Sequence, residues 1–128
     1  MILSERTMTL KLKRAYELAS KTDGLRVLVD RLWPRGVSKK TARIDHWFRE
    51  IAPSAELRKW FNHDPEKWAK FRQKYFRELN ANREVVDQLR ELLHRGTVTL
   101  VYGAKDEEHN DAVALQEYLT SHRGENRK

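Results

Sequence analysis

The sequence predicts an α/β fold, a single domain with a small, mainly parallel sheet flanked by helices. Three observations indicate this class. Two short apolar runs, LRVLV at 25–29 and TVTLVY at 97–102, are typical of buried strands, and each is followed by a polar loop. Long segments between and after them carry apolar residues at helical spacing. The chain has 128 residues, about the length of one domain, and we expect flexible ends at 1–8 and 122–128.

The first half of the chain predicts two strands joined by a turn. Apolar and polar residues alternate from Met8 to Lys13, which indicates a half-buried strand at about 9–13. Thr-Asp-Gly at 22–24 is a turn signal, and the strand at about 25–30 ends before Pro34 and Gly36. We expect the strands at 9–13, 25–30 and 97–102 to share one sheet.

Residues 38–52 allow two interpretations. Ile44, Trp47, Phe48 and Ile51 have the spacing of one helical face. A short helical turn after Ser38, followed by a strand over 44–49, fits the same residues. Pro53 ends either element.

The second half predicts three longer helices after a brief one capped by Ser54. Asp64-Pro65-Glu66 is a helix start, and the apolar stripe Trp68, Phe71, Tyr75 and Leu79 follows it. A further helix begins near Asn82 and ends at Gly96, and Asn110 caps the last helix, which runs to about Ser121. The inward residues of the helix after Asn82 are predicted to be Val85, Val86, Leu89, Leu92 and Leu93.

Composition excludes several classes of protein. The chain has no cysteine, which excludes disulfides, thiolate nucleophiles and zinc–thiolate sites. It has no apolar stretch long enough to span a membrane, and its start lacks a basic region followed by an apolar run. We therefore expect a cytoplasmic protein with no membrane partner.

The net charge of +7 lies in the first third. Residues 1–43 hold eleven of the basic residues and four of the acidic ones, an excess of seven. This asymmetry favours an anionic partner, either a phosphorylated or carboxylated small molecule or a nucleic acid. The alternative is that the charge only aids solubility.

The loop after the second predicted strand is the first candidate site. Ligands gather at the carboxyl ends of strands in open α/β sheets. Asp30 is a candidate catalytic residue there, and arginine forks bind phosphate or carboxylate in two-point contacts. The candidate ligand-binding residues of this loop are Arg31, Trp33, Arg35 and Lys39. The alternative is structural, with Asp30 paired to an arginine and Trp33 in the core.

The loop after the last strand is the second candidate. His109 is a candidate general acid or base, and Lys105, Asp106 and Asn110 are candidate ligand-binding residues before a helix N-terminus. Alternatively, Asn110 only caps the helix. Because both loops leave the same edge of a parallel sheet, we expect them side by side, with Arg31 or Arg35 near Asp106 or His109.

Other patterns are weaker. His63 beside Asp64 has the composition of an oriented imidazole, but Asp64 is also a helix cap. No pair of histidines or carboxylates has the spacing of metal ligands, so we expect no metal site. No P-loop or dinucleotide fingerprint is present, and no cofactor is expected.

Three runs of sequence resemble one family in the same order. RVLVDRLWPRGVSK, IAPSAELRKWFNHDPEKWAKF and VTLVYGAKDEEHNDAVALQEYL are similar to the YeaO-like family, within the broader group called domain of unknown function 488. The resemblance covers about residues 9–120, implies no defined activity, and favours the strand at 44–50.

The broader group carries a pattern that this chain keeps only in part. Asp-x-Arg before a proline is kept here, as are Lys105, Asp106 and His109. Tyr102 and Asn110 stand at the pattern's cysteines, so the resemblance excludes thiol chemistry. Asp111 and Ala112 stand at its His-Arg positions.

Three functions remain open on the sequence. The first is a pocket for an anionic ligand, with or without catalysis. The second is a nucleic-acid-binding accessory protein that uses the basic first third. The third is a small protein-interaction module without chemistry. A pocket requires converging charges, whereas nucleic-acid binding requires a broad basic face. The oligomeric state is undetermined.

Overall fold

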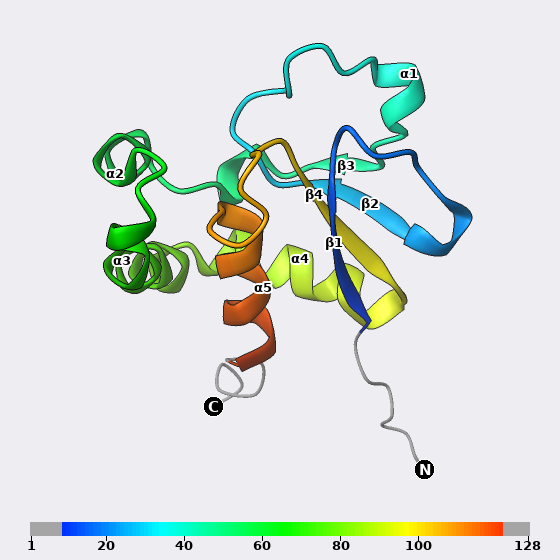
Figure 1. Cartoon of the computed structure of the whole chain (residues 1–128). Coiled ribbons are helices and arrows are strands. Elements are labelled where there is room, and N and C mark those ends of the chain that lie inside the picture. Colours follow the sequence, from blue (N-terminus) through cyan, green and yellow to red (C-terminus); the bar gives the residue numbers. More distant parts are fainter. Residues whose placement is uncertain (1–8, 122–128) are drawn as a thin grey trace.

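The fold is a four-stranded parallel sheet with four of its five described α-helices packed on one face, which confirms the predicted α/β class (Figure 1). The computed structural model describes residues 9–121, so the ends at 1–8 and 122–128 lie outside the described residues. The strands follow the order β1-β4-β2-β3, with β4 and β2 central. The strands are β1 (Leu10–Arg14), β2 (Leu25–Leu28), β3 (His46–Trp47) and β4 (Val98–Tyr102).

The helices also match the predicted series. Within the described residues, none is both long and apolar enough to cross a membrane. The α-helices are α1 (Lys39–Ala42), α2 (Ala55–Phe61), α3 (Trp68–Ala81), α4 (Arg83–Arg95) and α5 (Asp111–Ser121). Short 3₁₀ turns lie at η2 (Lys21–Asp23), η3 (Arg49–Ile51) and η4 (Pro65–Lys67).

Side-chain caps set the helix starts that the sequence predicts. The Ser54 hydroxyl accepts a hydrogen bond from Leu57 N at 3.1 Å, and the Asp64 carboxylate accepts one from Glu66 N at 3.0 Å. Asn110 Oδ1 accepts from Val113 N at 2.9 Å. Each bond satisfies an N–H group that has no partner within its own helix.

A strand does lie within residues 44–50, but it is a short one. Only His46 and Trp47 pair with β2 before the chain turns into η3. Trp47 packs on one face of the sheet and Phe48 on the other, because successive strand residues point to opposite faces. The apparent helical spacing of Ile44, Trp47, Phe48 and Ile51 therefore comes from two separate apolar clusters.

The main core lies between the sheet and helices α2 to α5. Val27 and Leu100 contribute from the central strands, and Phe71, Tyr75 and Leu79 from α3. Trp68 is only partly buried, at the rim of this core. The opposite face has a smaller cluster around Leu28 and Val101, covered by Trp33, Val37, Ile44 and Trp47.

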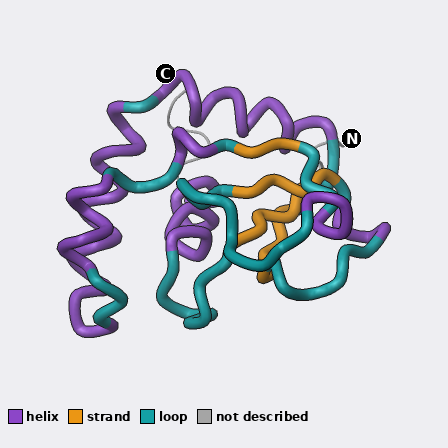
Figure 2. Tube along the Cα trace, turned by 90° about the horizontal axis from the view of Figure 1, so that it is seen from above, coloured by secondary structure: helices purple, strands orange, loops and turns teal. Residues whose placement is uncertain are grey.

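The carboxyl ends of the strands meet at one edge of the sheet, which Figure 2 shows from above. Leu28 of β2 pairs with Val101 of β4, and Arg14 of β1 with Tyr102. The loops after β2 and β4 therefore leave the sheet together, and α5 begins at this edge.

Candidate functional site

The two predicted loops lie side by side and are joined by Asp30. Asp30 Oδ2 accepts a hydrogen bond from Gly103 N at 2.9 Å, across 73 residues of sequence. The Asp30 carbonyl also accepts one from Trp47 Nε1 at 2.8 Å. A Cβ atom at Gly103 would lie 3.2 Å from Asp30 Oδ2 and 3.3 Å from Pro34 Cβ, so glycine permits this close approach.

A cavity of about 520 Å³ opens between these loops and α2. Its wall contains aromatic, aliphatic, basic and acidic side chains. The loop after β2 contributes Asp30, Arg31 and Leu32. Helix α2 and the turn after it contribute Ala55, Arg58, Lys59, Phe61, Asn62 and His63, and the loop after β4 and the start of α5 contribute Tyr102, Ala104, His109, Asn110 and Asp111.

Two carboxyl groups face this cavity with raised pKa values. Burial raises the pKa of Asp30 to about 6, against the opposing effects of the Gly103 N–H and the positive charge of Arg58. Burial and then repulsion from Asp30 raise the pKa of Asp111 to about 7, with Arg58 again opposing. Near neutral pH the pair therefore holds protons that ordinary aspartates have lost.

Arg58 is the cation of the cavity wall whose charge acts on both of these groups. Its Nε donates to the Pro53 carbonyl at 3.3 Å, and its two terminal nitrogens have no hydrogen-bond partner within residues 9–121. The chain then reverses through two left-handed residues, Asn62 (φ 47°) and His63 (φ 55°), which bring His63 to the cavity wall. Asparagine and histidine adopt this conformation more readily than most residues.

His109 is held by its own loop. Its Nδ1 lies 3.0 Å from Asp106 Oδ2, and Asp106 Oδ1 accepts from the backbone N–H groups of Glu108 and His109. The Glu108 N–H and then the imidazole lower the pKa of Asp106. Trp68 contacts the imidazole edge-on at 5.3 Å between ring centres. Asp106 and Trp68 thus orient the ring, and Nε2 is the nitrogen left for a ligand.

Asn110 is mainly structural. Its side chain is buried, its Oδ1 caps α5, and its Nδ2 donates to the Asp106 carbonyl at 2.8 Å. It lines the cavity while fixing the loop that carries His109. The predicted cap and the predicted site residue are therefore one group.

Comparison with known proteins finds the family that the sequence motifs resemble. A family model described as "Inactive DUF488-N3 subclade" matches residues 9–127. The chain belongs to this subclade. It is 40% identical over 114 residues to the uncharacterized protein YeaO of Escherichia coli, which covers 89% of this chain and 99% of YeaO. Uncharacterized proteins of Mycobacterium bovis and Mycobacterium tuberculosis are 37% identical, with 89% of this chain and 96% of each relative covered. No solved structure matches.

Several expected ligand-binding residues of this DUF488-N3 chain lie outside the cavity wall. Arg35 is exposed on the loop after β2, Lys39 is exposed at the start of α1, and Lys105 is exposed beside Asp106. Trp33 is partly buried, with its Nε1 donating to the Val37 carbonyl at 2.7 Å. Arg31 shares the cavity with His109, whereas Arg35 does not line it.

Sequence reasoning missed Arg58, Lys59 and Asp111 as cavity residues. Arg58 and Lys59 lie on a short helix whose pattern resembles a solvated face, so no local signal points to a site. Asp111 has the ordinary place of an acidic residue at a helix start. One signal was available, because the resemblance to the broader group places Asp111 at a histidine position of its pattern.

The structure shows no metal centre in the part of the chain it describes. No group of three or more histidine and carboxylate side chains there is placed to hold a metal ion. Asp30, Asp111 and His109 share the cavity, but the Asp106 carboxylate already engages the imidazole.

Proposed function

We propose that the cavity binds a small anionic ligand through a phosphate or carboxylate group. The observation that carries this proposal is the convergence of Arg31, Arg58 and Lys59 on one cavity at the carboxyl ends of β2 and β4. The terminal nitrogens of Arg58 lack hydrogen-bond partners within residues 9–121, although a guanidinium is suited to two-point contacts with such anions.

The two carboxyl groups are compatible with an anion because of their protonation. With pKa values of about 6 and about 7, Asp30 and Asp111 are substantially neutral in mildly acidic solution. A protonated carboxyl donates a hydrogen bond to an anion instead of repelling it. Binding should therefore be accompanied by proton uptake.

Binding without turnover fits this chain better than catalysis. The family description includes the word "inactive". At the cavity wall, Tyr102 and Asn110 stand at cysteine positions of the broader pattern, and Asp111 at the histidine position. Asp30 and His109 remain the residues we would assign to a proton transfer, and we place them here as ligand contacts.

Titration with sulfate tests the proposal, because sulfate keeps its charge between pH 6 and 8. Amide chemical shifts followed at constant ionic strength should move around Asp30, Arg58 and His109. We expect affinity at pH 6 to exceed that at pH 8 by about threefold or more, through proton uptake by the two carboxyls.

The decisive variant is Arg58→Gln, which should weaken sulfate binding about tenfold or more by removing the charged fork. Arg83→Gln, an exposed arginine at the start of α4, is the matched control and should bind as the parent does. Equal weakening in both variants, or shifts scattered over the surface, would show that the cavity is not an anion site.

A further inference from the structure

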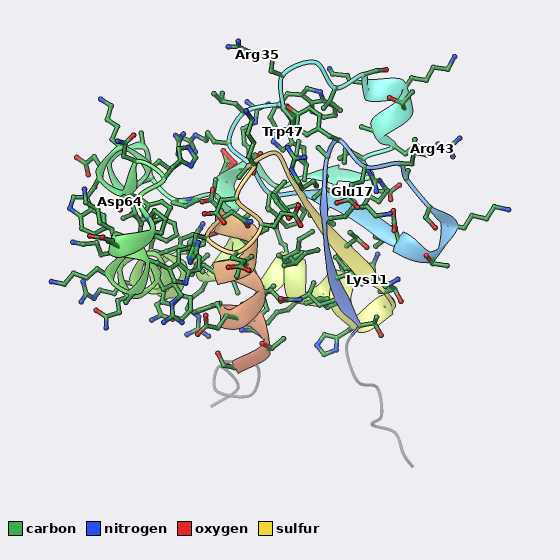
Figure 3. The ribbon with its side chains drawn as sticks, in the orientation of Figure 1. Lys11, Glu17, Arg35, Arg43, Trp47 and Asp64 are labelled. Atoms are coloured by element: carbon green, nitrogen blue, oxygen red, sulfur yellow. The ribbon has the colours of Figure 1, made fainter. Side chains whose placement is uncertain are left out.

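A second positively charged surface lies beside the cavity. Of its basic residues, Arg31 also lines the cavity wall, and the others do not. The segment 31–43, called here the basic lobe, leaves β2 and projects above the sheet before β3 (Figure 1). It contains five basic residues and no acidic one, and all five are exposed: Arg31, Arg35, Lys39, Lys40 and Arg43. In Figure 3, Arg35 and Arg43 extend outward from it.

These five cations are not neutralised within the described residues. None of their side chains makes a hydrogen bond or salt bridge there. Lys39 Nζ lies 5.8 Å from the centre of the Trp33 ring. The lobe therefore presents five charges to solvent over thirteen residues.

Other basic residues of the first third are used internally. Lys13 and Arg26 both pair with the buried Asp23, at 3.0 Å and 2.7 Å. Lys11 donates to the Thr22 carbonyl, and Arg14 to the Ala104 carbonyl. Outside the lobe, Lys21 is the one described basic residue of the first third whose side chain makes no such contact, so most cations of this third that lack a hydrogen bond or ion pair lie on the lobe.

Aromatic rings are interleaved with these charges. The Tyr16 ring is 49% exposed, its hydroxyl donates to the Arg35 carbonyl at 2.8 Å, and Arg14 lies 4.8 Å from its centre. Trp33 of the lobe contacts Trp47 of β3 edge-on, with 5.5 Å between the ring centres. Tyr16 is therefore a fixed, accessible ring beside the lobe cations.

We propose that the basic lobe and Tyr16 bind single-stranded nucleic acid. Free cations beside a fixed aromatic face are the combination that such binding uses: charges hold the phosphates and the ring stacks on a base. Duplex groove recognition is disfavoured, because the helix of the lobe, α1, has only four residues. This site shares only Arg31 with the anion cavity, since Tyr16, Arg35, Lys39, Lys40 and Arg43 do not line that cavity.

The test is fluorescence anisotropy of the full chain with a labelled oligothymidylate and an oligouridylate. Arg35→Gln/Lys39→Gln/Lys40→Gln removes three lobe charges. Lys70→Gln/Arg77→Gln/Arg83→Gln removes three exposed charges from α3 and α4 and is the matched control. We expect the lobe variant to bind about tenfold or more weakly and the control to stay within about twofold of the parent.

Salt dependence supplies a second readout. Neutralising five phosphates gives a slope of about −3.5 for log affinity against log salt, and removing three charges should reduce its magnitude by about 2. Tyr16→Ala should weaken binding about fivefold or more, whereas Tyr16→Phe keeps the stacking face and should bind as the parent does.

Several outcomes would overturn the proposal. These are undetectable binding at low salt, equal weakening by the lobe and control variants, or preference for a duplex or for anionic phospholipid vesicles over the single strands. Sulfate binding in the cavity is measured separately, so a failure here leaves the proposed function untouched.

Discussion

At the scale of single residues, the Asp30–Asp111 pair makes the site costly to fold. Both carboxyls have pKa values above those of an unfolded chain, at about 6 and about 7 against 3.8. The protonated carboxyls make a contribution to the free energy of unfolding that is fully present below the unfolded pKa of 3.8. This contribution is lost as pH rises through the folded pKa values. A site that retains such a pair sacrifices stability near neutral pH, as functional sites often do.

Replacing one of these carboxyls should therefore stabilise the protein in alkaline solution. Asp111→Asn should raise the free energy of unfolding by on the order of 2 kcal/mol at pH 8, after allowance for its partial exposure. At pH 3, below the unfolded pKa of 3.8, the carboxyl is protonated in both the folded and the unfolded chain, and the change should be under about 0.5 kcal/mol. Urea denaturation at both pH values measures the difference.

The matched control is Asp87→Asn, an exposed aspartate on α4, which should change stability little at either pH. If Asp111→Asn lowered the free energy of unfolding at pH 8, favourable interactions of the ionised Asp111 carboxylate would outweigh its burial and its repulsion from Asp30.

At the scale of secondary-structure elements, α3 packs against α2 on one side and against α4 and α5 on the other. Phe71 is fully buried and stacks on Phe61 of α2 at 4.4 Å, whereas Trp68 lies at the rim. All four residues of the apolar stripe on α3 were predicted to face inward. Phe71, Tyr75 and Leu79 are buried, whereas Trp68 is only partly buried.

Alanine substitutions should separate these two positions. Phe71→Ala should cost about 3–5 kcal/mol by leaving a cavity that its neighbours cannot fill. Trp68→Ala should cost about 1–2 kcal/mol, because part of its surface already contacts water. Urea midpoints measure both. Equal losses would show that Trp68 is as buried as Phe71, and an unchanged midpoint for Phe71→Ala would contradict the packing of α3.

At the scale of the whole molecule, the aspartates divide into groups with opposite pH behaviour. Burial tends to raise the pKa of Asp23, but the Lys13, Ser20 and Arg26 hydrogen bonds outweigh it and leave that pKa below its usual range. Asp23 thus stabilises the fold above the unfolded pKa of 3.8, and this contribution is lost as pH falls through its lowered folded value. Asp30 and Asp111 have the opposite effect, because their contribution to stability is lost as pH rises.

The free energy of unfolding should consequently be greatest near the unfolded pKa of 3.8, at about pH 4, and should decline on both sides. Urea midpoints between pH 3 and 8 test this profile. The double variant Asp30→Asn/Asp111→Asn should flatten the decline above about pH 4, and Asp23→Asn should flatten the one below it. Stability that rises steadily from pH 5 to 8 would refute the assignment of the two cavity carboxyls.

The sequence by itself determined the elements and their order, because these depend on local patterns. Apolar runs followed by polar loops predicted β2 and β4, and the caps Ser54, Asp64 and Asn110 marked helix starts. The parallel arrangement then predicted that the loops carrying Asp30 and His109 would meet. Local periodicity left residues 44–51 undecided, since their apolar side chains belong to two faces of one sheet.

Only the tertiary structure decided which charges act together. Arg58 and Asp111 join Asp30 because α2 and the start of α5 reach the same sheet edge, and no pattern within either helix records that meeting. The fold also separated the cations that Asp23 neutralises from those left free on the basic lobe. Electrostatic effects depend on distance and burial, and both are set by contacts between residues far apart in the chain.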